Sequence, residues 1–422
     1  MINKVLNVLG YTVIAVLNQS AQAISIEQAW QAAKRYDPTY EQAQIGVKLG
    51  ENNIMTSRSA LLPSLTASTT SIWNKKKGTS NTYTASLNQT IWNSSLWSQM
   101  DQADANLVIS QLRLSKVHNE LVKRLITAYL AQASAQGDLE LAQRKRDEGR
   151  KLLVITEQRF NAGKVKSIEV EDMRTNQLEE KTAILKAQSK LEDTRSELLA
   201  LINQFPDHVD QIRGHSLAEP TMLVDSQQRW LELAKDNNPE LLVAKQKVKV
   251  SEYDRDMAKG GYYPTLLGTI GYQNIDKSSA GEFNASLTLK VPIDLNGSTQ
   301  AKVDTTLLNI RHTQQDQRKI EINIQKLVQK QFSQVSINWQ QVLMAKELVD
   351  SRERVLKSKQ TLYNAGMSEA SNVIDAHNHL FSARNNLQIN LYNYWQQRVD
   401  LLQTAGMLDD DTINLISVAL TS

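Results

Sequence analysis

The sequence contains no cysteine, so no disulfide bond contributes to the fold. This suits an exported protein that does not rely on disulfides. Beyond residue 23 the chain also lacks any apolar run close to the about 20 residues that a transmembrane helix needs. If the rest of the chain enters a membrane, it must do so as β-strands, which satisfy their backbone groups by pairing with one another.

The chain also lacks a strong excess of charge, because 48 basic and 45 acidic residues leave a net charge of +3. This balance gives no reason to expect a nucleic acid partner. No glycine-rich phosphate loop, nucleophile elbow or catalytic carboxylate pair stands out. His377 and His379 with Asp375 stand two residues apart, a spacing that does not share a helix face, and no third ligand is suitably placed. The sequence therefore predicts neither an enzyme nor a bound metal or cofactor.

Residues 1–23 have the pattern of a secretory signal peptide. Lys4 is the short positive region, Val5–Leu17 is the apolar region and Ala21–Ala23 is a small-residue cleavage site. The apolar region is too short for a comfortable membrane helix. We therefore expect cleavage after Ala23 and a mature chain that begins at Ile24.

Beyond this segment the chain repeats itself at an offset of about 200 residues, the mark of a duplicated architecture. The repeated pairs are Ala33–Pro38 with Ala234–Pro239, Leu61–Leu65 with Tyr262–Leu266, and Phe160–Gly163 with Tyr363–Gly366. The repeat predicts one duplicated body, with a first repeat at 24–205, a connector at 206–226 and a second repeat at 227–422.

Helical patterns dominate each repeat. Apolar spacing indicates a helix from Ile24 to about Ala60, ended before Pro63. Two long proline-free stretches each predict a helix of about 60 residues, about 90 Å long. They cover about 98–159 and 298–362, and further helices are expected at about 167–203 and 370–405. The residues expected on their inner faces are small and favour packing around a hollow over a thick solid core: Ala128, Ala131, Ser134, Ala135 and Ala142.

Two blocks, at about 65–92 and 265–293, change to the alternating period of β-strands. A polar turn at 74–81 separates the first pair. The strands are about ten residues long, enough to cross a bilayer when tilted. Aromatic residues near the strand ends are candidates for the membrane interface, namely Trp73, Tyr83, Trp92, Tyr263 and Tyr272.

Four such strands cannot close a barrel, since even eight leave an interior just filled by side chains. Open strand edges are not tolerated in lipid. Strands in a membrane would therefore have to be pooled from several chains. Alternation alone leaves open a second interpretation, in which the strands are ordinary hairpins packed against a core.

The order and spacing of several motifs resemble the TolC family of outer-membrane export channels over essentially the whole mature chain. They are Leu61–Leu65, Gln89–Trp92, Arg159–Gly163, Tyr262–Leu266, Tyr363–Gly366, Asn372–Ala376 and Leu401–Leu408. The resemblance implies a mainly α fold with a membrane β-barrel. Three protomers, with four strands each, would form one 12-stranded barrel that continues into a long periplasmic α-helical barrel.

The same resemblance implies a passive exit duct in the Gram-negative outer membrane, extending into the periplasm. It would belong to a tripartite efflux pump or a type I secretion system. The implied partners are a homotrimer, outer-membrane lipid, a periplasmic adaptor protein and an inner-membrane transporter.

A periplasmic gate is a further implication of the resemblance. Asn372 and Asp375 match two aspartates of the family's constriction, and only Asp375 is acidic here. Three-fold symmetry would bring the three Asp375 carboxylates together and favour cations. A solvated helix aspartate is the plainer interpretation of the same residue.

Two polar links close the gate in the family. Tyr363 matches the gate tyrosine and Glu169 its acidic partner, so this link can form. Ser368 replaces the gate arginine and Ile168 its threonine partner, so the second link is lost. We expect a closed state that is held less tightly than the family pattern suggests.

The adaptor-docking tips implied by the resemblance are two helix-breaking turns in which glycine supplies a positive φ. Their residues are Asn161, Ala162, Gly163, Lys164, Asn364, Ala365, Gly366 and Met367. Alanine precedes each glycine where the family usually has valine, which bears on which adaptor fits.

Two other classes of function remain as alternatives. A structural coiled-coil envelope protein without transport activity would explain the long helices but not the alternating strands. A secreted enzyme would need a catalytic constellation that the sequence does not display.

Overall fold

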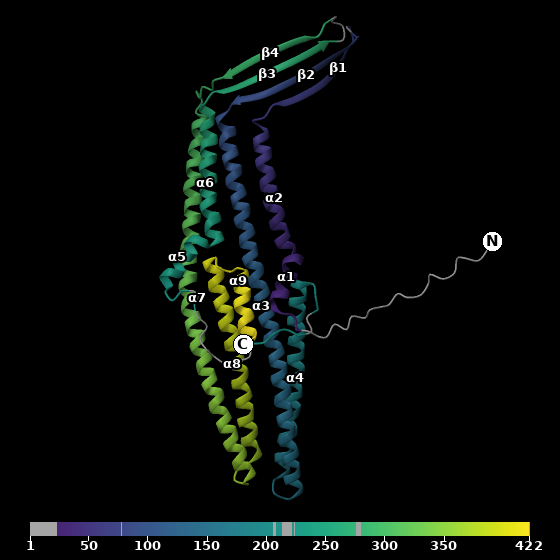
Figure 1. Cartoon of the computed structure of the whole chain (residues 1–422), viewed down its shortest axis with the longest axis vertical. Coiled ribbons are helices and arrows are strands. Elements are labelled where there is room, and N and C mark those ends of the chain that lie inside the picture. The colour runs from purple at the N-terminus through teal and green to yellow at the C-terminus, as the bar shows by residue number, and fades with distance from the viewer. Residues whose placement is uncertain are drawn as a thin grey trace, which may run out of the picture.

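The computed structural model describes residues 23–76, 78–205, 208–212, 222, 224–275 and 280–421. They form a slender column of helices that carries a four-stranded sheet at one end (Figure 1). The predicted signal peptide, apart from Ala23, and much of the predicted connector 206–226 lie outside the described residues.

Two helices run most of the length of the column. They are α3 (Ser94–Asn161) and α7 (Ser298–Asn364), of 68 and 67 residues. On the sheet side α3 contacts α2 (Pro38–Ser59) and α6 (Pro239–Lys259), and α6 also contacts α7. Away from the sheet, α3 pairs with α4 (Ser167–Ile202), and α7 pairs with α8 (Ala370–Ala405). No described helix has an apolar stretch sufficient to cross a membrane. The four predicted helices are confirmed to within about four residues at their ends, where assignments commonly vary.

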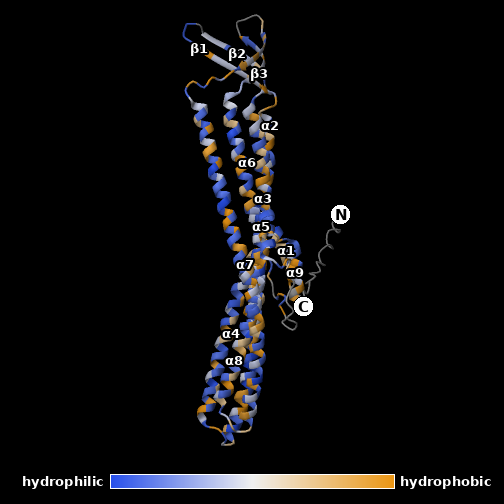
Figure 2. Cartoon of the chain, turned by 90° about the vertical axis from the view of Figure 1, so that its left-hand side faces the viewer, coloured by the Kyte–Doolittle hydropathy of each residue, from blue (hydrophilic) through white to orange (hydrophobic). Residues whose placement is uncertain are grey.

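Three short helices lie against the middle of the column. They are α1 (Ile26–Tyr36), α5 (Gln227–Asn237) and α9 (Asp410–Thr421), and we call them the belt. Figure 2 shows α1 and α9 projecting from one side of the column. The sequence pattern did not predict α9.

The single helix expected from Ile24 to Ala60 is wrong, because the chain bends at Asp37 into α1 and α2. The Asp37 carboxylate accepts a hydrogen bond from the Tyr40 amide at 2.8 Å, and Pro38 is the first helical residue. Asn238 caps α6 in the same way through the Leu241 amide. Proline is favoured at the first position of a helix, so the repeated Asp-Pro and Asn-Pro pairs each start a new helix.

A solid core, which the sequence pattern did not predict, lies where the belt meets the column. Trp30 and Trp230, at equivalent places in the two repeats, are both 2% exposed. Tyr129, Trp339 and Trp395 join the same cluster. Ala131 and Ala142 are only half-buried. Large aromatic side chains therefore fix the belt to the column at this level.

The sheet is antiparallel in the order β1-β2-β3-β4, which is also the chain order. The strands are β1 (Ser64–Asn74), β2 (Gly78–Trp92), β3 (Thr265–Ile275) and β4 (Glu282–Lys290). The turn expected at 74–81 is shorter, because β2 begins at Gly78, whose φ is +72°. β1 and β4 are the edges of the sheet, and within the described chain each has a partner on one side only.

The strand register separates the two faces of the sheet, because residues opposite each other in neighbouring strands share a face. One row across the strands is Leu65, Leu87, Ile270 and Ala285. The next row, on the other face, is Thr66, Ser86, Gly271 and Asn284. The apolar face is open, with Leu65 74%, Leu287 73% and Phe283 80% exposed. The predicted alternation is thus present across all four strands.

Candidate functional site at the paired helix tips

The end of the column opposite the sheet consists of two helical hairpins, α3–α4 and α7–α8 (Figure 1). Each hairpin turns through the same capping arrangement. At the first turn the Lys164 amide donates to the Arg159 carbonyl and the Gly163 amide to the Phe160 carbonyl. The second turn repeats this pattern around Gly366. Gly163 and Gly366 have φ of +68° and +77°, so the predicted role of these glycines is confirmed.

We expect Gly163→Ala and Gly366→Ala to loosen the tips. A Cβ at either position meets no atom within 4 Å, so the penalty comes from the left-handed backbone alone. It is about 1 kcal/mol, which makes hydrogen exchange of the turn amides about fivefold faster. Gly46→Ala is the control, since Gly46 lies inside α2 with equally open surroundings and should become slightly more stable. If the three substitutions changed the hydrogen exchange rates of nearby amides by the same factor, the proposed role of the glycines in the turns would be contradicted.

The predicted tip residues are all at the surface. Met367 is 77% exposed, and Lys164, Asn161 and Asn364 are exposed as well. Ala162 and Ala365 are the cap residues that precede the glycines. Their role in adaptor docking remains a prediction.

One arginine ties the end of α7 to α3. The Arg159 guanidinium donates to the carbonyls of Tyr363, at 2.6 Å, and Asn364, at 3.0 Å. It also lies over the Tyr363 ring, 4.4 Å from the centroid. These carbonyls belong to the last turn of α7, where cations are favoured by the helix dipole. The two hairpins are therefore joined close to their tips.

Tyr363 makes a different link from the one expected. Its side chain is 1% exposed, and its hydroxyl lies 3.0 Å from that of Thr156, which is itself buried. No hydrogen bond joins Tyr363 to Glu169 among the described residues, and the gate link between them remains a prediction. Glu169 instead accepts a hydrogen bond from the Ala370 amide at 3.0 Å, which places a carboxylate at the N-terminus of α8. Thr156 and Arg159 were missed because nothing in the local pattern pairs them with a tyrosine more than 200 residues away.

The residues of the second gate pair, Ser368 and Ile168, make no hydrogen bond with each other among the described residues. The Ser368 hydroxyl lies 3.5 Å from the Glu369 carbonyl oxygen, and Ile168 is 58% exposed. Neither side chain joins the hairpins.

The two constriction candidates lie on one exposed strip of α8. Asn372 and Asp375 are three residues apart, a spacing that places them on the same helix face. Lys359 donates to Asn372 at 3.4 Å. The Asp375 carboxylate has no hydrogen bond or ion pair among the described residues, so its charge is directed to solvent.

A buried polar seam lies between the hairpins above the tips. His377 is 4% exposed, and its Nε2 lies 3.3 Å from a Glu148 oxygen. Burial lowers the pKa of His377, and Glu148 opposes this shift. In the same layer Asn378 donates to Asn176, which donates to Glu180 at 2.8 Å. Hydrogen bonds, and not only apolar contacts, thus hold the hairpins together here.

Glu180 is the most enclosed carboxyl of this seam, at 1% exposed. It fits because α3 has a glycine opposite, and a Cβ at Gly149 would meet Glu180 Oε2 at 2.5 Å. Oε2 is buried without a hydrogen-bond partner among the described residues. Burial raises the pKa of Glu180, and the hydrogen bond from Asn176 opposes that shift. The mid-helix Gly149 was the signal in the sequence that could have located this contact.

We expect Glu180→Gln to raise stability at neutral and alkaline pH. Between its ordinary and its raised pKa, the folded chain holds a proton that the unfolded chain has lost, so stability falls as pH rises through this window. The amide cannot ionise, so it removes the cost of a buried charge and keeps the acceptor for Asn176. Its N–H group takes the unpaired place of Oε2, so we expect a net gain of about 1 kcal/mol. Thermal unfolding at about pH 8 and about pH 5 measures it, and the two proteins should converge in acid. Glu179→Gln is the control, because Glu179 is exposed. An equally large gain in stability from Glu179→Gln would show that the effect of Glu180→Gln does not come from burial of the carboxyl group.

The predicted interface aromatics lie at both ends of the sheet. Trp92 and Tyr263 flank the helical end, and both are about half exposed, at 51% and 53%. Trp73, near the far end of β1, is 72% exposed. Tyr83 is 50% exposed, and Tyr272 is half-buried with its ring 4.7 Å from that of Phe283. Their contact with the membrane interface remains a prediction.

Comparison with known proteins matches both halves of the chain to one family. The family model described as "Outer membrane efflux protein" matches residues 29–204 and 230–407. The chain is similar to the alkaline protease secretion protein AprF of Pseudomonas aeruginosa, at 24% identity over 97% of this chain and 90% of that protein. It is also similar to the outer membrane protein TolC of Vibrio cholerae, at 22% identity over 99% and 98% of the two chains.

Solved structures agree with this fold. CusC superposes with a TM-score of 0.80 at 17% identity, over 91% of this chain and 93% of its own. The open state of the MtrE outer membrane channel of Neisseria gonorrhoeae superposes with a TM-score of 0.75 at 18% identity, over 92% and 90% of the two chains.

Proposed function

The chain belongs to the outer membrane efflux protein family, and from this premise we propose that three copies assemble into one passive exit duct across the outer membrane. The family consists of channel proteins. The chain is an outer-membrane exit duct for efflux or type I secretion, in line with relatives that include protease secretion and TolC proteins. An inner-membrane transporter would supply the energy, and a periplasmic adaptor would join it to the tips.

One observation supports the proposed trimer most directly. The sheet has one polar and one open apolar face, and its outer strands β1 and β4 lack partners within the described chain. Unpaired strand edges are not tolerated in lipid. Pooling the strands of three chains would pair every edge, direct the apolar faces to lipid and enclose the polar faces around a passage.

The helices extend this passage in the proposal. α2, α3, α6 and α7 continue directly from the strands and lie side by side (Figure 1). Three such sets would form a helical barrel, with the hairpin tips at its far end. The tips carry the exposed side chains Lys164 and Met367, which suit contact with an adaptor.

The absence of cysteine makes a direct test possible. Lys164→Cys or Met367→Cys would carry a cross-linker in living cells, and mass spectrometry would identify the captured protein. Capture of a drug-pump adaptor assigns the duct to efflux, and capture of a secretion adaptor with an ATP-driven transporter assigns it to type I secretion. Heat-modifiable trimers in the outer-membrane fraction are expected in either case. Recovery of monomers alone, or no adaptor from well-inserted protein, would overturn the proposal.

Ion selectivity tests the proposed constriction. We expect Asp375→Asn to lower the preference for cations severalfold, because it removes the ring of carboxylates, and Asn372→Asp to raise it by adding a second ring. The reversal potential across a planar bilayer under a salt gradient measures both. Asp350→Asn removes another exposed carboxylate, from α7, and should change the potential little. An effect of Asp350→Asn equal to that of Asp375→Asn would remove Asp375 from the constriction.

A further inference from the structure

Four basic side chains surround a hollow between α3, α6 and α7, on the sheet side of the belt. The hollow has a volume of about 550 Å³. Arg113 and Lys116 come from α3, Lys247 from α6 and Lys319 from α7. The carboxylates that line it are Glu240 and Asp316. In the lining of this hollow, basic side chains therefore outnumber acidic side chains by two.

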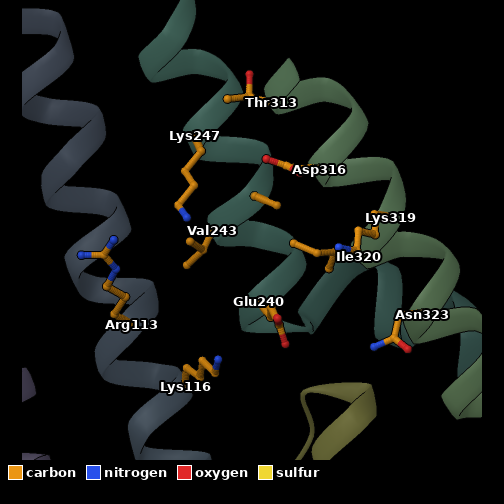
Figure 3. A pocket seen from close by; sticks show the side chains of 11 residues that line it. Arg113, Lys116, Glu240, Val243, Lys247, Thr313, Asp316, Lys319, Ile320 and Asn323 are labelled. Carbon is orange, nitrogen blue, oxygen red and sulfur yellow. The ribbon is translucent and has the colours of Figure 1, made fainter. Parts of the chain in front are cut away.

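Of the four basic groups of the hollow, Lys116 has an ion pair, with Glu120 at 3.8 Å. Figure 3 shows Arg113 and Lys247 converging on the space between α3 and α6. Neither side chain makes a hydrogen bond or ion pair with any described residue, and the same holds for Lys319. Asp316 also contacts His312, at 3.4 Å. Two carboxylates do not balance four basic groups in this lining, so an anion between the basic groups would reduce their mutual repulsion and stabilise the arrangement.

The hollow opens on the face of the helix layer away from the belt. On α3, His118 contacts Trp30 of α1 and Asp410 of α9, with ring centroids 5.2 Å apart in the first pair. Lys116 precedes His118 by two residues, which places it about 160° away around the helix.

On α7, too, the residue that lines the hollow lies on the opposite side of the helix from a residue that contacts the belt. Glu321 pairs with Lys235 of α5 at 3.3 Å, and Lys319 again precedes it by two residues. Both α3 and α7 therefore place the hollow on the face of the helix layer away from the belt. Figure 3, with α3 on the left and α7 on the right, views the layer from the side opposite to Figure 1.

We propose that this hollow binds a small, multiply charged oxyanion of the phosphate or polycarboxylate class. Arg113 and Lys247 would hold it from two helices, and Thr313 and Asn323 add neutral polar groups to the lining. Arginine forks and lysine ammonium groups are the usual side-chain partners of such anions. In the proposed duct, on which this step rests, a belt on the outside would turn the opposite face inward, so that three such sites would ring the passage.

Direct binding tests the site. Purified full-length protein is titrated calorimetrically with inorganic pyrophosphate at low salt. We expect one anion per chain, weakened as salt screens the charges. Arg113→Gln with Lys247→Gln should weaken binding about tenfold or more, since each exposed charge contact is modest. The matched control is Lys151→Gln with Lys249→Gln, which removes equal charge from exposed positions of the same two helices outside the hollow. No binding, or equal losses in both double variants, would overturn the site.

Two sources of the anion can be told apart. A resident ion would co-purify and be released as phosphate or polycarboxylate on denaturation. An anion in transit would be absent from purified protein and would interrupt single-channel current when pyrophosphate is added. Both results support the site, and interruptions that persist in the Arg113→Gln/Lys247→Gln protein would count against it. Oligomeric state is read separately by size-exclusion chromatography, so a failure of the trimer is distinguishable from a failure of the site.

Discussion

Leu287→Arg is expected to prevent insertion into the outer membrane, whereas Ser286→Arg is expected to be tolerated. The two residues are neighbours in β4, and both are exposed in the single chain. Leu287 pairs with Gly268 on the apolar face, and Ser286 pairs with Thr269 on the polar face. An arginine facing the middle of the bilayer costs about 2–4 kcal/mol in a membrane barrel, and a trimer would bear that cost three times.

The fraction of heat-modifiable protein in purified outer membranes measures this effect. Each variant adds the same charge one residue apart, so expression and net charge are matched. Equal insertion of both, or loss of both, would contradict the assignment of the apolar face to lipid.

Removing a belt tryptophan is expected to have the largest effect on the stability of the helical column. Trp230 is 2% exposed, and its indole N–H donates to the Val224 carbonyl at 2.9 Å. Trp230→Ala would leave a large cavity and an unpaired carbonyl, a loss of about 3–5 kcal/mol.

Trp97→Ala is the matched control, because Trp97 is 45% exposed on α3 and should lose about 1 kcal/mol or less. The temperature at which the helical circular dichroism signal disappears compares the two. A smaller shift for Trp230→Ala than for Trp97→Ala would show that the belt is not part of the cooperative core.

Much of this architecture follows from local patterns. Period two marks the strands, and the absence of proline with alanine- and glutamine-rich composition marks the long helices. The turns at Gly163 and Gly366 were found because a positive φ leaves a strong compositional signal. The break at Asp37 carries an equally local signal, an N-cap followed by proline, and was missed only because the apolar spacing continues through it.

The parts of the site that were missed depend on contacts between distant segments. Arg159 meets the end of α7, and Glu180 meets Gly149 across two helices. No periodicity encodes such pairings, since each side chain is also an ordinary solvated residue in its own helix. The aromatic core at the belt was missed for the same reason. Each tryptophan is isolated in the sequence, and only the packing of α1 and α5 against the longer helices places the tryptophans in one cluster.

The unpartnered edges of β1 and β4 have a genetic consequence. In a closed ring of three, every chain supplies one edge to each neighbour, so a single defective edge leaves the whole ring open. A chain with a broken β4 edge, co-expressed in equal amount with the normal chain, would leave only about one eighth of the trimers intact. Edge mutations should therefore be dominant. Mutations confined to the hairpin tips would leave assembly unimpaired.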